Sequence, residues 1–129
     1  MEEFRQLRVY QHAREFTRGV WRATRQLPWS AQKLVVQLDD ACESIGSNIA
    51  EGCGRKNRFH GNSELVRYAH FSFGSANEAD HRLTGLLDRD LLDRTAYDAL
   101  YPSLQELRRE LRAWNAQLIL RDRGRISGG

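Results

Sequence analysis

The chain has 129 residues, of which 40% are hydrophobic and 29% are charged, and its formal net charge at pH 7 is +3. This length suits one domain with a single hydrophobic core, and no run of about 18 apolar residues could span a membrane. The N-terminus lacks the apolar stretch of a secretory signal, so we expect a cytoplasmic protein with no membrane partner.

Four segments carry apolar residues at the three- and four-residue spacing of an amphipathic helix. The first is expected over residues 4–26 and ends before Pro28, because the residue that precedes a proline avoids the helical conformation. The second is expected over residues 30–53, with Ser30 as its N-terminal cap and Gly52-Cys53-Gly54 as its stop.

The third segment is the longest, begins after Asn62, and has small residues in the middle of its apolar seam. The fourth segment carries the bulky apolar residues that such a seam needs as partners. Pro102 lies inside the fourth segment, which is therefore either one helix kinked at the proline or a main helix that starts at Ser103.

Together the four segments predict an all-α fold, an antiparallel up-down-up-down four-helix bundle. The bundle is expected to occupy residues 1–122 as a single domain. Residues 123–129 are polar and rich in glycine, so we expect them to form a flexible C-terminal tail.

The residues that could support catalysis or bind a metal do not match a known site. Glu78-Ala79-Asp80-His81 is a single Glu-x-x-His motif that points away from the apolar seam, whereas a di-iron bundle needs two such motifs facing inward. Cys42 and Cys53 are roughly 16 Å apart along one helix, too far for a disulfide or a shared metal, so we expect two buried thiols. The sequence predicts a protein that is not an enzyme and has no catalytic residues, metal or cofactor.

A stripe of arginines along the first segment is a candidate nucleic-acid surface. It lies beside Trp21 and consists of Arg14, Arg18, Arg22 and Arg25. Guanidinium groups next to an aromatic ring suit phosphate contacts and base stacking, which favours RNA as a partner. In the alternative interpretation, Trp21 belongs to the core and the arginines form a solvated face. They would then pair with acidic residues of the second segment, Asp39, Asp40 or Glu43.

One face of the third segment lies well off the apolar seam and carries Phe71, Ser75 and Glu78. Phe71 cannot easily reach the core that the seam forms. We therefore predict that these three residues contact another subunit of a homo-oligomer.

Polar residues line one side of the second segment, next to its apolar face. Ser44, Asn48 and Glu51 share that side, and the opposing wall of the seam contains Ser72 and Ser75. A buried polar side chain in a helical seam can fix the register of its helices, as an asparagine does in coiled coils. We predict that Ser44, Asn48, Glu51 and Ser72 form a hydrogen-bonded structural latch.

The segment around Asn48 is also similar to a known family. The run Ser44-Ile45-x-Ser47-Asn48-Ile49-Ala50-Glu51-Gly52-x-Gly54-Arg55 resembles the signature of the four-helix-bundle proteins of the 23S rRNA intervening-sequence family. Leu7-x-Val9-Tyr10-x-x-Ala13 and Gly74-Ser75-x-x-Glu78 extend the resemblance to the first and third segments. It implies a small bacterial protein that forms a ring-shaped homo-oligomer, a pentamer, with no catalytic activity established for the family. Related bundles bind nucleic acid through a basic surface.

The chain departs from the family pattern at two places. Asp39 and Asp40 stand where basic residues are usual, and Gly46 stands where a proline is usual. Our first hypothesis is a non-catalytic scaffold that assembles into a ring and contacts RNA or an RNA-associated protein. The alternative is a protein–protein interaction module with no nucleic-acid role.

Overall fold

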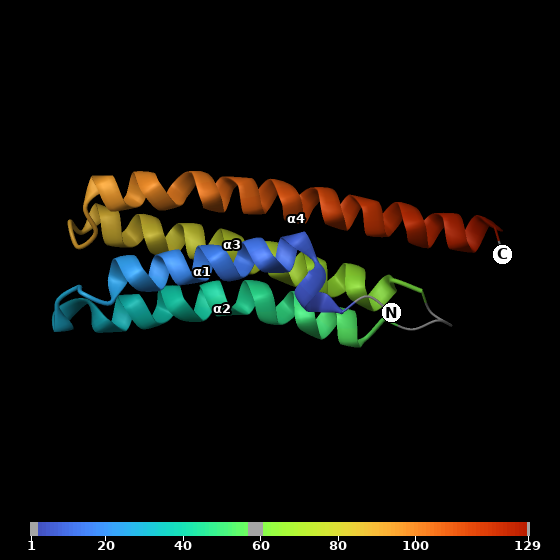
Figure 1. Cartoon of the computed structure of the whole chain (residues 1–129), viewed down its shortest axis with the longest axis horizontal. Helices are drawn as coiled ribbons and strands as arrows, with labels where there is room; N and C mark the ends of the chain where they lie inside the picture. Colours follow the sequence, from blue (N-terminus) through green and yellow to red (C-terminus); the bar gives the residue numbers. More distant parts are fainter. Residues whose placement is uncertain (1–2, 57–60, 129) are drawn as a thin grey trace.

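A computed structural model describes residues 3–56 and 61–128, with side chains through residue 124, as four helices that lie side by side (Figure 1). Two 3-10 turns, η1 and η2, precede the first two helices. The elements are η1 (Phe4–Gln6), α1 (Arg8–Thr24), η2 (Trp29–Ala31), α2 (Gln32–Gly54), α3 (Ser63–Asp88) and α4 (Arg94–Gly128). The predicted all-α fold is confirmed.

Successive helices run in opposite directions, so the bundle has the predicted up-down-up-down arrangement (Figure 1). Each helix packs on two neighbours: α1 on α2 and α4, and α3 on α2 and α4. The four helices therefore form a square in cross-section, in which α1 lies diagonally across from α3. The side between α1 and α4 is opposite the side between α2 and α3.

Small residues of α3 meet bulky residues of α4 in the core, as the apolar seams predicted. The buried small residues of α3 are Ala69, Ser72, Ala76 and Ala79, and the fully buried leucines of α4 are Leu104, Leu107 and Leu111. Small side chains let helix axes approach closely, and the leucines of the adjacent helix fill the space that remains. Phe16 is a large, fully buried side chain of α1, and α2 contributes Leu38, Ile45 and Ile49.

The start of α2 differs from the prediction. A 3-10 turn occupies residues 29–31, so the N-cap is Ala31, and no side chain makes a capping hydrogen bond there. Ser30 is exposed instead. The prolyl ring of Pro28 fixes the backbone in an extended conformation before the turn, which moves the first helical residue beyond the serine.

The fourth helix is continuous through Pro102, which resolves the two alternatives that the sequence allowed. Pro102 is exposed, so the carbonyl four residues earlier, which loses its helical donor, can bond to water. The helix extends to Gly128, whereas the sequence predicted a flexible tail from residue 123. Gly124 adopts helical geometry and does not end the helix. Residue 129 lies outside the described residues.

No helix in the described part of the chain is both long and apolar enough to cross a membrane.

Candidate functional site

Hydrogen bonds link α2 to α3 at the predicted latch. The side-chain amide of Asn48 donates to the Ser44 carbonyl at 2.8 Å and lies 3.5 Å from Ser75 Oγ on α3. Ser72 is fully buried, and its hydroxyl donates to the Ile45 carbonyl at 2.7 Å. Ser75 of α3 thus bonds to the Asn48 side chain of α2, and Ser72 of α3 bonds to the backbone of α2. These two bonds fix the register of the two helices.

Two residues of this region have roles that differ from the predicted ones. Glu51 is exposed and pairs with Arg55 at 3.0 Å, one turn along the same helix, so it takes no part in the latch. Arg55 also lies 5.2 Å from the centre of the Tyr68 ring. Ser75, predicted at the subunit interface, is half-buried and faces Asn48. The structure therefore assigns Ser75 to the latch in place of Glu51.

Two glycines of α2 let neighbouring side chains approach its backbone. A β-carbon at Gly52 would lie 2.8 Å from Tyr68 Cβ and 3.0 Å from a methyl group of Leu65, which is too close for any real side chain. At Gly46 the Tyr10 ring of α1 would lie 3.4 Å away. The segment that carries the family resemblance is thus mainly a helix-packing element.

We predict that Asn48→Leu keeps the helices but loosens their packing. The leucine removes the bonds to α2 and leaves Ser75 without its partner, which should cost about 1 kcal/mol of unfolding free energy. Far-UV circular dichroism should stay unchanged while the near-UV signal and the cooperativity of urea unfolding fall. A variant with native near-UV signal and native cooperativity would show that the latch does not specify the packing.

A polar cluster between α1 and α4 was not predicted from the sequence. His12 Nδ1 lies 2.9 Å from Glu110 Oε2, and His12 Nε2 lies 3.2 Å from Ser103 Oγ. This is the order of groups in a serine hydrolase, but Ser103 lies within α4, where neighbouring amides donate to carbonyls of the same helix. They are therefore not available to stabilise an oxyanion. The cluster is a set of interhelical hydrogen bonds.

The arginine stripe divides into two parts. Arg14 is half-buried and donates to both carboxylate oxygens of Glu43, at 2.9 and 3.0 Å, which is the paired arrangement of the alternative interpretation. The other three arginines are exposed beside Trp21, and we call this set the arginine surface: Arg18, Arg22 and Arg25 with Trp21.

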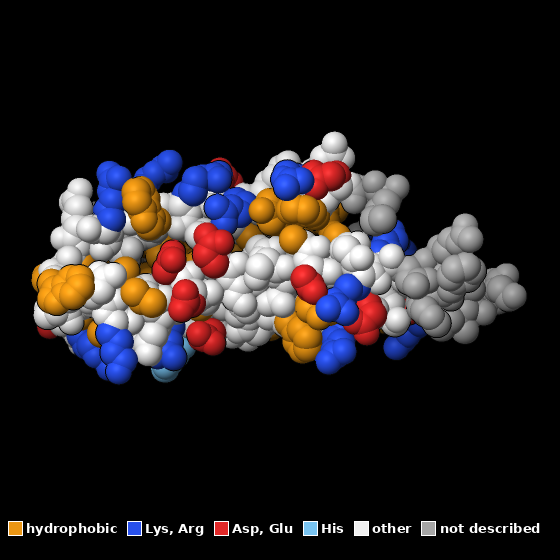
Figure 2. Space-filling view, turned by 90° about the horizontal axis from the view of Figure 1, so that it is seen from below, with side chains coloured by type: hydrophobic (Ala, Val, Ile, Leu, Met, Phe, Trp, Pro, Cys, Tyr) orange, Lys and Arg blue, Asp and Glu red, His pale blue; other side chains and the backbone are white. Residues whose placement is uncertain are grey.

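Trp21 is 53% exposed, so its predicted alternative position in the core is wrong. The Arg25 guanidinium lies 4.9 Å from the centre of the Trp21 ring. Arg18 and Arg22 line a shallow depression with Leu100 and Ser103 of α4. Trp29, in the turn after α1, is 84% exposed. Figure 2 shows basic side chains around exposed hydrophobic ones at this end of the bundle.

The outer face of α3 also exposes an aromatic side chain, as predicted. Phe71 is 45% exposed, makes an edge contact with Tyr68, and lies 5.4 Å from the Arg67 guanidinium. Glu78 is exposed two turns further along the helix, and Gly74 lies between them. We call Phe71, Gly74 and Glu78 the α3 face.

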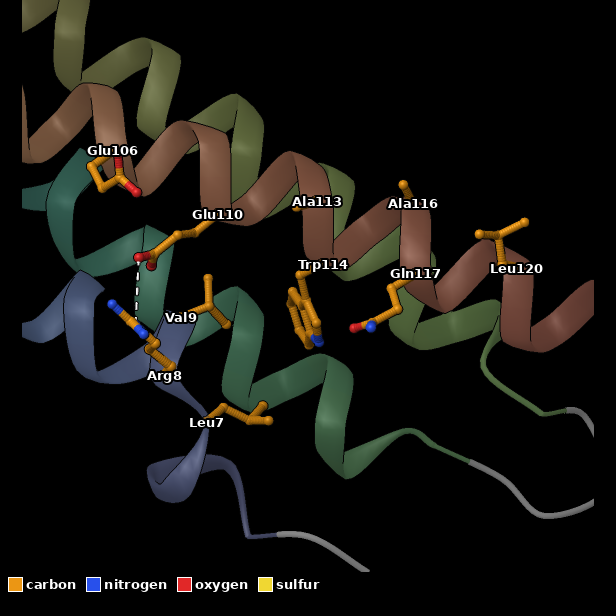
Figure 3. A pocket seen from close by; sticks show the side chains of 10 residues that line it. All are labelled: Leu7, Arg8, Val9, Glu106, Glu110, Ala113, Trp114, Ala116, Gln117 and Leu120. Carbon is orange, nitrogen blue, oxygen red and sulfur yellow. Dashed lines mark ion pairs between the residues drawn. The ribbon is translucent and has the colours of Figure 1, made fainter.

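An open groove of about 780 Å³ lies between the start of α1 and the second half of α4 (Figure 3). Its apolar wall includes Leu7 and Val9, and Trp114 extends toward them from α4. At one end Arg8 lies 3.7 Å from Glu110. The groove exists because α1 begins at Arg8, whereas α4 continues well beyond that level.

Within the described residues, no three histidine, cysteine, aspartate or glutamate side chains gather as metal ligands would. Neither Cys42 nor Cys53 forms a disulfide, and both are buried, as predicted. Glu78 and His81 are both exposed on α3, away from the core.

Comparisons with known proteins agree with the four-helix fold. A family model described as 23S rRNA-intervening sequence protein matches residues 5–113. No curated protein matches the chain. The crystal structure of a protein of unknown function from the S23 ribosomal protein family of Bacteroides thetaiotaomicron VPI-5482 is similar, with a TM-score of 0.71 and 21% sequence identity. That similarity covers 83% of this chain and 97% of the other, and at this identity it shows a shared fold. The family match spans most of the bundle, and the chain belongs to the 23S rRNA-intervening sequence protein family.

Proposed function

We propose that this protein is a non-catalytic scaffold that assembles into a homo-oligomeric ring and contacts RNA through the arginine surface. The observation that carries the RNA contact is the exposed Trp21 ring with the Arg25 guanidinium 4.9 Å from its centre. The exposed indole ring of Trp21 offers a stacking surface for a base, and the neighbouring arginine side chains offer contacts to phosphates.

The position of the acidic residues limits where RNA would bind. Asp39, Asp40 and Glu43 cluster on α2, and the pKa of Asp39 is raised by burial and by its two acidic neighbours. The negative charges of neighbouring carboxylates repel phosphate. Because Glu43 also neutralises Arg14, we assign the contact to Arg18, Arg22 and Arg25 and leave Arg14 out of it.

Self-assembly is supported by the family resemblance, which implies a pentamer, and by the exposed Phe71 on α3. When a second subunit covers a large aromatic side chain that is half-exposed, the apolar surface of that side chain is removed from water, which favours association. We expect Phe71→Asp to dissociate the oligomer without unfolding the bundle, as measured by light scattering and circular dichroism.

RNA binding is tested with a fluorescein-labelled single-stranded 20-nucleotide RNA, titrated at 50 and 200 mM salt. The double variant Arg18→Glu/Arg22→Glu should weaken binding at least about tenfold and reduce the salt slope by about 1.4, because each single-strand phosphate contact contributes about 0.7. The matched control, Arg94→Glu/Arg109→Glu, changes the same number of charges on α4, where both arginines already pair with acids of their own helix.

Wild-type binding that does not depend on salt, or an equal loss in both double variants, would contradict the RNA contact. The alternative, a protein–protein interaction module, would then hold if Phe71→Asp still breaks the assembly.

A further inference from the structure

We infer that the groove between α1 and α4 receives the α3 face of a second copy of the chain, so that the ring closes by groove-to-face contacts. This inference rests on the proposed self-assembly and identifies the two surfaces that carry it.

The groove and the α3 face lie on opposite sides of the bundle. The groove is formed by α1 and α4. Phe71 lies toward the α2–α3 side, because it contacts Tyr68, whose Cβ faces Gly52 of α2. A contact between two different surfaces joins copies head to tail, which gives either a ring or an open filament.

The two surfaces also lie at the same height along the bundle. The Asn62 amide donates to Asp122 at 2.8 Å, and the Arg112 guanidinium lies 5.0 Å from the centre of the Phe73 ring. The stretch of α3 that holds Phe71 is therefore level with the stretch of α4 that lines the groove. Copies that meet through surfaces at equal height do not climb along the helix axis, and this absence of an axial rise is what a closed ring requires.

The side chains at matching heights are complementary. The Arg8 side chain is 90% exposed at the end of the groove, where its carboxylate neighbour Glu110 is 3.7 Å away. Glu78 has no ion-pair partner among the described residues. Glu78 lies two residues before Asp80, which pairs with Arg108 of α4. Arg8 lies beside Glu110, in the same stretch of α4, so Glu78 and Arg8 are at a similar height along the bundle. Parallel copies bring Glu78 next to Arg8 and the Phe71 ring next to Trp114.

Gly74 is a second, independent feature of the α3 face. It is exposed in the middle of a 26-residue helix, and a β-carbon there would meet nothing within 4 Å. Glycine is the least favourable residue of a helix interior apart from proline, and no contact in this chain needs its small size. The small size of Gly74 would be needed if α1 or α4 of a second copy packed closely against this face.

The test is a charge exchange across the inferred contact, read out by light scattering of the full chain over a concentration series. Arg8→Glu and Glu78→Arg should each lower the association constant at least tenfold, because each places like charges together. The double variant Arg8→Glu/Glu78→Arg restores the opposite charges between copies and should recover wild-type mass. Within one chain the two residues are on opposite sides, so recovery cannot come from repair of the fold.

The outcomes separate the inference from the proposed function. An oligomeric wild type with unchanged single variants, or a double variant no better than the singles, overturns the groove-to-face contact and leaves self-assembly standing. A monomeric wild type overturns both. Gly74→Ala is the second probe, and the inference requires it to weaken the assembly while circular dichroism shows an intact or more stable bundle.

Discussion

Gly52→Leu is expected to lower the free energy of unfolding by about 3 kcal/mol or more. A β-carbon at this position would lie 2.8 Å from Tyr68 Cβ and 3.0 Å from a methyl group of Leu65, and the nearer obstacle is the rigid base of the Tyr68 side chain. Relief requires α2 and α3 to separate, which would also stretch the Asn48 and Ser72 hydrogen bonds. Urea unfolding followed by circular dichroism measures the change.

Gly54→Leu is the matched control, because it makes the same substitution on the same helix two residues away. A β-carbon at Gly54 would meet nothing within 4 Å, and leucine is a better helix former than glycine by up to about 1 kcal/mol. The two variants should therefore change stability in opposite directions. Equal effects would mean that helix propensity at the end of α2, and not the close approach of α3, explains both.

Raising the pH from 9 to 12 should destabilise the wild-type protein by about 3 kcal/mol through Cys42 alone. Burial, followed by the nearby charges of Asp39 and Glu43, raises the pKa of the Cys42 thiol to about 12, against 9.0 for an ordinary thiol. Above pH 9 the unfolded chain loses this proton while the folded chain keeps it. The stability present below pH 9 is thus lost progressively until the pH reaches the folded-state pKa.

Cys42→Ala isolates this contribution, because alanine does not titrate. The variant should be less stable than the wild type at pH 8 owing to the space it leaves, but the difference should shrink between pH 9 and 12. Parallel stability profiles for the two proteins would show that Cys42 does not titrate differently in the folded and unfolded states.

Local patterns in the sequence were enough to predict the four helices and the complementary seams of α3 and α4. Helix periodicity repeats every three or four residues, so it can be read without knowing the fold. The role of Asn48 followed in the same way, from its position beside the apolar stripe. The pairing of Glu51 with Arg55 also has a local signal, the four-residue spacing of opposite charges on one helix, and that signal argued against Glu51 in the latch.

Contacts between residues far apart in the chain were not predictable. His12 meets Glu110 across 98 positions, and no local spacing indicates that α1 and α4 bring them together. Gly52 was interpreted as part of a helix stop, because the sequence does not reveal that Tyr68 and Leu65 pack over it. The sequence allowed Trp21 to lie either in the core or at the surface. Which of the two is correct depends on how α1 is rotated about its axis relative to α2 and α4.

The difference in helix length gives the end of α4 a mechanical property. At 1.5 Å per residue, α1 is roughly 26 Å long and α4 roughly 52 Å, from 17 and 35 residues. The last turns of α4 therefore extend beyond α1, and they are displaced further than the rest of the helix when α4 tilts. The Asp122 carboxylate accepts a hydrogen bond from the Asn62 amide, which joins this end of α4 to the start of α3. Replacing Asp122 with alanine would therefore remove one contact between the end of α4 and the start of α3.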